Sequence, residues 1–142
     1  MKVQLLNRAY YRPIPKVRFW ERQKFELGEP LEFFTDKYGL IVCEKGTVWN
    51  LSSIPRIPGL HYILPVNDDH IYSSCLHDEL YSKKKHGGRG YMKTSSGVVK
   101  ITRKAADKLF YWCSLAEGLE KWKAKLMYRG LRMAFFQDLK SW

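Results

Sequence analysis

"NDDHIYSSCLHDELYSKK", residues 67–84, is the stretch that decides the fold. It opens with an Asn-Asp-Asp run, residues 67–69, whose side chains are suited to capping the N-terminus of a helix. Apolar residues then recur at helical spacing, in the order Ile71, Tyr72, Cys75, Leu76 and Leu80. The stretch therefore predicts a helix, and it places an imidazole and a carboxylate, His77 and Asp78, side by side within that helix.

The segments on either side of this helix differ in kind. Before it, "LEFFTD" (31–36) and "YGLIVCEKGTVWNL" (38–51) are rich in β-branched and aromatic residues, which favours roughly four or five short strands. After it, the polar stretch "KHGGRGYMKTSSGVV" (85–99) indicates a loop, and two further helices are expected over 102–118 and 119–139. The prediction is an α+β fold: a small N-terminal antiparallel β-sheet followed by three α-helices, two of them packed antiparallel.

The bulk properties indicate one globular domain. A chain of 142 residues, 45% of them hydrophobic, is expected to form a single domain over 1–142, β- and loop-rich over 1–66 and helical over 67–142. No apolar run approaches the ~20 residues of a membrane span, and the N-terminus is too broken by Arg, Lys and Pro to be a signal peptide. Three widely spaced cysteines match no zinc pattern and no disulfide framework, so buried free thiols in a cytosol are expected.

The charge of the chain points to an anionic partner. A net charge of +11 favours contact with nucleic acid, a phospholipid surface or an acidic neighbouring subunit. Lys83, Lys84, Lys85 and Arg89 follow the predicted helix and are the candidate phosphate-binding residues. Cations on the two later helices would join them if the faces converge: Arg103, Lys104, Lys108, Lys121, Lys123, Lys125, Arg129 and Arg132. The alternative is a solvated basic face that binds nothing specific.

The helical geometry gives the polar residues different directions. Residues one apart on a helix project about 100° from each other, so His77 and Asp78 diverge, whereas Tyr81 lies one turn beyond His77 on nearly the same face. If the helix that carries Asp107 packs antiparallel on the first, its carboxylate can reach a ring nitrogen of His77 and support it as a general base on water. Asp78 would then be able to bind a hard cation. The structural alternative is a surface or core histidine, with Asp107 paired to a basic residue of its own helix.

Four segments, taken in order, resemble a family found in tailed phages and prophages, the domain of unknown function 1353. They are "WNLSSIPR" (49–56), "LHDELY" (76–81), "RKAADKLF" (103–110) and "LMYRGLRMAF" (126–135). The first three resemble the family's strand-to-turn element and its two motif helices, and the last resembles its basic, aromatic C-terminal helix. The resemblance covers roughly residues 25–137. It implies a particle or tail component, with other phage structural proteins as partners and the virion or the host cytoplasm as its location.

That family is in turn similar to the secreted, calcium-dependent phospholipases. Their catalytic helix carries a His-Asp pair followed by Tyr, and a second helix carries an Asp that orients the His. The likeness implies that His77 is the general base, Asp107 its orienting carboxylate and Tyr81 a third member of the group. It also implies that Asp78 holds a calcium ion. Asn50 stands where the phage pattern has an acidic residue, and would be a second, neutral ligand.

Departures from the phospholipase pattern weigh on the function. The candidate calcium loop, "NLSSIPRIPGLHY" (50–62), has a single Gly and two Pro, and Ser52 and Ser53 in it are expected to hydrogen-bond the turn. The departures favour a virion-associated or accessory protein on a phospholipase-like helical scaffold, in which the polar residues fix helix packing. The alternative is a hydrolase with a His-Asp dyad that cleaves an ester or amide of the cell envelope with a divalent cation. A third interpretation, from charge alone, is a basic nucleic-acid-binding protein.

Overall fold

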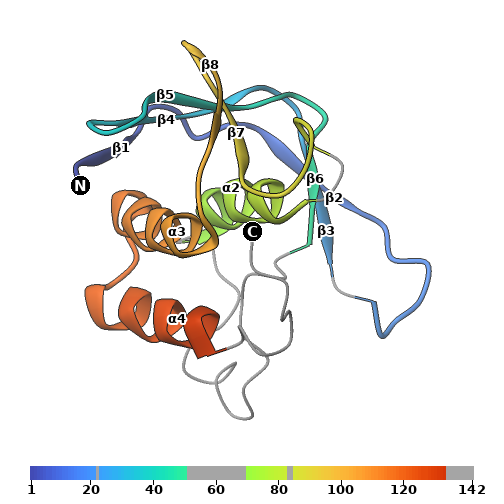
Figure 1. Ribbon diagram of the computed structural model, residues 1–142. Helices are drawn as coiled ribbons and strands as arrows, with labels where there is room; N and C mark the ends of the chain where they lie inside the picture. The colour runs from blue at the N-terminus through green and yellow to red at the C-terminus, as the bar shows by residue number, and fades with distance from the viewer. Residues whose placement is uncertain (22, 51–69, 83–84, 134–142) are drawn as a thin grey trace.

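The computed structural model describes residues 1–21, 23–50, 70–82 and 85–133. Their strands form two antiparallel sheets (Figure 1). The larger sheet has the order β1 (Val3–Leu5), β4 (Leu31–Thr35), β5 (Gly39–Cys43), β7 (Tyr91–Thr94) and β8 (Gly97–Lys100). The smaller sheet has the order β2 (Tyr11–Ile14), β3 (Lys24–Leu27) and β6 (Val48–Trp49). With the helices described next, the predicted α+β class is confirmed.

Three helices lie to one side of the larger sheet (Figure 1): α2 (Ile71–Tyr81), α3 (Arg103–Glu117) and α4 (Lys121–Met133). Helix α2 packs under the sheet, α3 packs against α2, and α4 packs against α3. The side-chain contacts between α2 and α3 run in opposite order along the two helices: Ser73 with Ser114, His77 with Asp107, and Tyr81 with Arg103. The two helices are therefore antiparallel, as predicted.

Helix α2 is the central element of the fold. Nine of its eleven residues are buried, polar ones included. Its apolar side chains join the main core, which also takes Leu27, Phe33 and Ile41 from the sheets and Leu109 from α3. A smaller cluster fills the contact between α3 and α4 and consists of Phe110, Leu119, Ala124, Met127 and Leu131. Because the polar side chains of a central helix are removed from water, they need partners within the protein.

The two ends of α3 follow the sequence signals for a helix start and stop. The hydroxyl of Thr102 accepts a hydrogen bond from the backbone N–H of Ala105 at 3.2 Å, which caps the N-terminus. Gly118 ends the helix with φ of 114°, a conformation that a residue with a Cβ rarely adopts. The helix predicted over 102–118 is therefore confirmed, with Thr102 and Gly118 as its capping residues.

The N-terminus of α2 is capped from another helix. The run of residues 67–69, expected to cap it, lies outside the described residues. The side chain of Glu117, at the end of α3, accepts hydrogen bonds from the backbone N–H groups of Tyr72 at 2.7 Å and Ser73 at 2.9 Å. A buried carboxylate therefore satisfies two of the donors that a helix start leaves without an intrahelical partner.

The loop predicted over residues 85–99 is wrong in part, because it contains the hairpin of β7 and β8. Strand β7 extends the larger sheet by pairing with β5, and a two-residue turn of Ser95 and Ser96 leads into β8. Only Met92 and Thr94 of these strands are buried. An edge hairpin that buries so few side chains has the composition of a loop, so its strands could not be predicted from the sequence. The described residues also form eight strands in two sheets, where one sheet of four or five short strands was expected.

The cysteines behave as predicted. Cys43, Cys75 and Cys113 are buried free thiols. Burial raises the pKa of Cys113 and Cys75, so these thiols stay protonated. Among the described helices, none is long and apolar enough to cross a membrane.

Candidate functional site

The buried contact between α2 and α3 contains a His–Asp pair. Nε2 of His77 lies 2.9 Å from Oδ1 of Asp107, and the two side chains are 3% and 0% exposed. A carboxylate can only accept, so Nε2 of His77 donates to Asp107. The contact that the antiparallel packing predicted is therefore present.

Asp107 has two further donors. The hydroxyl of Tyr81 donates to the same Oδ1, and Nη1 of Arg132 on α4 donates to Oδ2 at 2.8 Å. Burial raises the pKa of Asp107, but hydrogen bonds from His77 and Tyr81 outweigh that effect and leave the pKa below its ordinary value. Asp107 is thus an ionised carboxylate that joins side chains from all three described helices.

Tyr81 links the pair to a second arginine. Its hydroxyl accepts a hydrogen bond from Nε of Arg103 at 3.3 Å, and Nη2 of Arg103 lies 3.4 Å from the carbonyl oxygen of Leu131. Burial, and then the hydrogen bond to Asp107, raise the pKa of Tyr81, so it stays a phenol. We refer to His77, Tyr81, Arg103, Asp107 and Arg132 as the Asp107 network.

Two cations expected on a phosphate-binding surface belong to this network instead. Arg103 is buried at 9% exposure, and Arg132 forms an ion pair with Asp107. Asp107 and Arg132 lie 25 positions apart on different helices, so residue spacing within one helix could not reveal their pairing. The available signal was that Arg132 falls within "LMYRGLRMAF", the last of the four segments that resemble the phage family.

An open cleft lies beside the network. It has a volume of about 310 Å³ and is lined by Lys24, Val48, Trp49, Asn50, Asp78, Tyr81 and Ser82. Oδ2 of Asp78 accepts a hydrogen bond from the backbone N–H of Asn50 at 3.2 Å. Asp78 therefore faces the end of β6 while His77 faces α3, which is the divergence that their adjacent positions predict. Tyr81 is shared, because its side chain lies in the Asp107 network and it also lines the cleft.

The predicted cation ligands lie together, but the described residues do not complete a calcium site. Calcium takes six to eight oxygen ligands. Asp78 is the one carboxylate among the described residues of the cleft, and Lys24, a cation, lines the same space. No group of three or more His, Cys, Asp or Glu side chains is placed to hold a metal within the described parts of the chain. Ser52 and Ser53 lie outside those parts.

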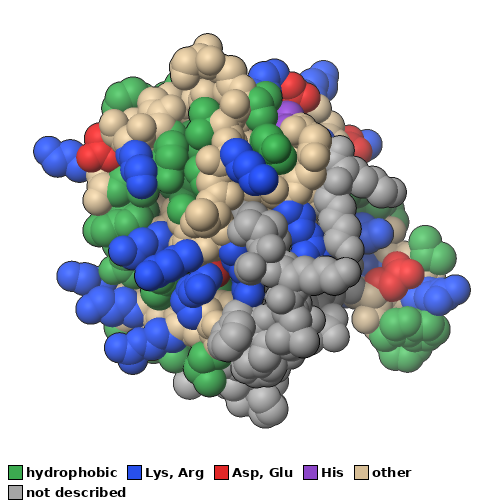
Figure 2. All heavy atoms as spheres, viewed as in Figure 1, with side chains coloured by type: hydrophobic (Ala, Val, Ile, Leu, Met, Phe, Trp, Pro, Cys, Tyr) green, Lys and Arg blue, Asp and Glu red, His purple; other side chains and the backbone are tan. Residues whose placement is uncertain are grey.

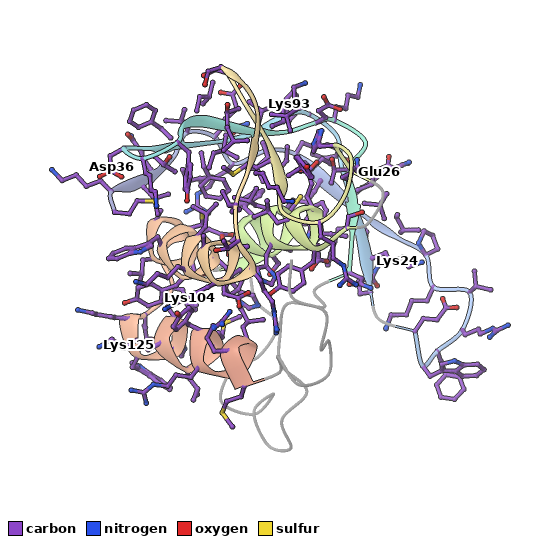
Figure 3. All side chains as sticks on the ribbon, in the orientation of Figure 1. Lys24, Glu26, Asp36, Lys93, Lys104 and Lys125 are labelled. Atoms are coloured by element: carbon purple, nitrogen blue, oxygen red, sulfur yellow. The ribbon has the colours of Figure 1, made fainter. Side chains whose placement is uncertain are left out.

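The candidate phosphate-binding residues are only partly described. Lys83 and Lys84 lie outside the described residues, and Lys85 and Arg89 are half-buried in the loop between α2 and β7. On the face shown in Figure 2, Lys and Arg side chains gather instead over α3 and α4. Lys104 from α3 and Lys125 from α4 belong to this group (Figure 3), and both are exposed.

The chain matches a known protein family over most of its length. A family described as "Protein of unknown function (DUF1353)" matches residues 25–131. The chain belongs to the DUF1353 family. No curated protein and no solved structure matches the chain significantly. The part that matches DUF1353 contains the first four members of the Asp107 network and stops one residue before Arg132, whereas β1 and β2 lie before it.

Proposed function

We propose that this DUF1353 protein is a hydrolase that cleaves an ester bond of a cell-envelope phospholipid, with His77 as its general base. The hydrogen bond between His77 and Asp107, one helical turn from the cleft that Asp78 and Tyr81 line, is the observation that carries the proposal. His77 does not itself line the described cleft, but its ring centroid lies 4.3 Å from that of Tyr81, which does. A base that a buried carboxylate orients, and that water can reach from such a cleft, is the arrangement that water activation needs.

The reaction follows from these positions. Nδ1 of His77 takes a proton from a water molecule as the water oxygen bonds to the ester carbonyl carbon. The tetrahedral intermediate then breaks its bond to the leaving alcohol, and the imidazolium returns the proton to that alcohol's oxygen. Asp107 holds the tautomer and compensates the charge that the ring gains. Tyr81 is a positioning residue, because it acts on the reaction through Asp107.

The lining of the cleft supports an amphiphilic substrate. Val48 and Trp49 give the cleft an apolar wall, and Lys24 brings an ammonium group that can pair with a phosphate. Asn50 and Ser82 add polar side chains to the lining. A phospholipid ester has an acyl chain, a carbonyl and a phosphate, and so matches all three features.

The test is release of fatty acid from mixed phospholipid vesicles by the wild type and by His77→Gln. Glutamine keeps a donor for Asp107 but has no basic nitrogen, so we expect release to fall by about 100-fold or more. His86→Gln is the matched control, because His86 contacts Glu79 and belongs neither to the Asp107 network nor to the described lining of the cleft, so full release should be kept. Absence of release by the folded wild type would refute the proposal.

The same assay, run with a chelator and then with added calcium, examines the calcium ion that the resemblance to phospholipases implies at Asp78. Because the described donors do not complete a calcium site, no step above depends on the ion. Release that needs calcium and is lost in Asp78→Asn would place the ion at this cleft. Release that is unchanged by the chelator would remove calcium from the proposal.

A second candidate is a virion-associated or accessory protein, in the particle or the host cytoplasm, in which the network is structural. The observation that favours it is that Asp107 joins side chains of α2 and α4, so that the network alone would fix helix packing. The basic surface over α3 and α4 would then dock on acidic phage subunits or on nucleic acid. This candidate predicts no release by the wild type and lower thermal stability of His77→Gln.

A further inference from the structure

The turn between β2 and β3 exposes three apolar side chains. Val17, Phe19 and Trp20 are 89%, 87% and 66% exposed. Figure 1 shows that this turn extends away from the rest of the molecule, beyond the end of the smaller sheet. Single exposed apolar residues are common on soluble proteins, but three within four positions on a projecting turn indicate a contact surface.

The geometry of the turn places the two aromatic rings at its tip. The backbone N–H of Glu21 donates to the carbonyl oxygen of Arg18 at 3.1 Å, so Phe19 and Trp20 are the two central residues of a turn. Their rings pack edge to face with centroids 5.0 Å apart, and the guanidinium carbon of Arg18 lies 5.6 Å from the centre of the Trp20 ring. We call residues Val17, Arg18, Phe19 and Trp20 the aromatic tip.

The outer edge of the hairpin, formed by β2, is not suited to pairing with a strand of another chain. β2 is an edge strand of the three-stranded sheet. Pro13, in the middle of β2, has no N–H to donate, so this edge cannot be extended by a regular antiparallel strand. Contact with a partner is therefore expected through the side chains of the aromatic tip.

The composition of the tip matches a lipid surface. Tryptophan and phenylalanine favour the headgroup region of a bilayer, and flanking lysine and arginine favour anionic lipids. Lys16, Arg18 and Lys24 are exposed on the hairpin, and the chain as a whole carries a net charge of +11. Both the apolar and the electrostatic contributions to membrane association are thus present on one projecting element.

The base of the hairpin is next to the cleft and contributes to its lining. Tyr11 on β2 and Phe25 on β3 pack against Trp49, with ring centroids 6.1 Å and 5.7 Å from it. Trp49 and Lys24 also line the cleft. A lipid surface that bound the aromatic tip would therefore bring the cleft near that lipid surface.

We propose that the aromatic tip inserts into the surface of an anionic phospholipid bilayer. The insertion buries Val17, Phe19 and Trp20 among the lipid headgroups and upper acyl chains, while Lys16 and Arg18 pair with lipid phosphates. Presentation of the bilayer ester groups to the cleft rests on the proposed hydrolase function, whereas the binding itself does not.

The test is co-sedimentation of the full chain with phosphatidylglycerol vesicles and, separately, with phosphatidylcholine vesicles. The variant is Phe19→Ser with Trp20→Ser. The matched control is Trp122→Ser, because Trp122 is 52% exposed on α4, away from the hairpin. We expect the wild type and the control to bind phosphatidylglycerol vesicles. The tip variant should bind them at least about tenfold more weakly, and a tenfold loss of affinity corresponds to about 1.4 kcal/mol. Lys16→Glu with Arg18→Glu should weaken binding to phosphatidylglycerol vesicles, and salt should weaken wild-type binding.

The outcomes separate this inference from the proposed function. Equal binding by the tip variant and the wild type, or no wild-type binding to phosphatidylglycerol, overturns the inference. Self-association of the wild type that the tip variant loses, without vesicle binding, overturns it too and assigns the tip to a second copy of the chain. Vesicle binding without fatty-acid release refutes only the hydrolase, and release from a soluble short-chain lipid without vesicle binding refutes only the insertion.

Discussion

His77 on α2 and Asp107 on α3 share a 2.9 Å hydrogen bond in the interior of the protein. The bond orients the imidazole and, with its neighbours, sets the register of two antiparallel helices. The proposed catalysis and the stability of the fold therefore depend on the same atoms, and each variant must be measured for both. The predictions below are designed so that the two effects can be separated.

Replacement of Asp107 by asparagine tests the charge at the centre of the network. One oxygen now accepts from His77 and Tyr81 and the other from Arg132, so an amide NH₂ must face at least one donor. We expect Asp107→Asn to lower the free energy of unfolding by about 2–4 kcal/mol, measured by urea denaturation. Asp36→Asn is the control: Asp36 is exposed, and its change should stay within about 0.5 kcal/mol. Equal effects at the two positions would contradict a central role for the Asp107 carboxylate.

Replacement of Arg132 by methionine tests the link between α4 and the pair. Methionine keeps an unbranched apolar side chain but removes the ion pair with Asp107. Arg132 is one-third exposed and Asp107 keeps two other donors, so the expected loss is about 1–2 kcal/mol of unfolding free energy. Arg129→Met, at an exposed position of the same helix, should change stability by less than about 0.5 kcal/mol. Thermal unfolding of the two variants side by side gives the comparison.

The sequence allowed the His77–Asp107 contact to be predicted as one of two alternatives, the other being Asp107 paired with a basic residue of its own helix. The stretch around His77 has one clear helical period, and Ala105 and Ala106 allow a second helix to approach closely. Once these two helices are antiparallel, the geometry leaves Asp107 opposite His77. Local periodicity placed both residues on helices, and the antiparallel packing seen in the structure decided between the two alternatives.

Arg132 and Glu117 could not be placed in the same way. Their partners lie 25 and at least 44 residues away in the chain, and long or flexible side chains can reach in several directions. The burial of α2 on both sides could not be predicted either, because it arises from the sheet above the helix and from α3 below it. Such contacts depend on how elements stack, which residue spacing within one element does not encode.

The carboxyl group of Glu117 predicts a pH dependence of stability. Burial raises its pKa from 4.5 to about 7, against the opposing effect of the Tyr72 and Ser73 backbone N–H groups. Between these two values the folded state binds more protons than the unfolded state, so the contribution of Glu117 to stability is full below about pH 4.5 and is lost as the pH rises through about 7. We therefore expect the stability of the wild type relative to Glu117→Gln to fall over this range.

The measurement for Glu117 is the free energy of unfolding of both proteins from about pH 5 to about pH 8. Glutamine does not titrate, so it serves as the reference for every other group in the protein. A difference between the two proteins that stays constant would show that the carboxyl group titrates near its ordinary value, and wild-type stability that grows with pH would show a lowered pKa.

Replacement of Tyr81 by phenylalanine separates catalysis from structure. The change removes one donor to Asp107 and the acceptor of Arg103 Nε, but leaves the ring, whose centroid lies 4.3 Å from that of His77. We expect a loss of about 1–2 kcal/mol in unfolding free energy, by urea denaturation. If Tyr81 only positions Asp107, fatty-acid release falls a few-fold while His77→Gln abolishes it. A loss as complete as that of His77→Gln, at temperatures where the variant is folded, would instead make Tyr81 a catalytic residue that contacts the substrate in the cleft it lines.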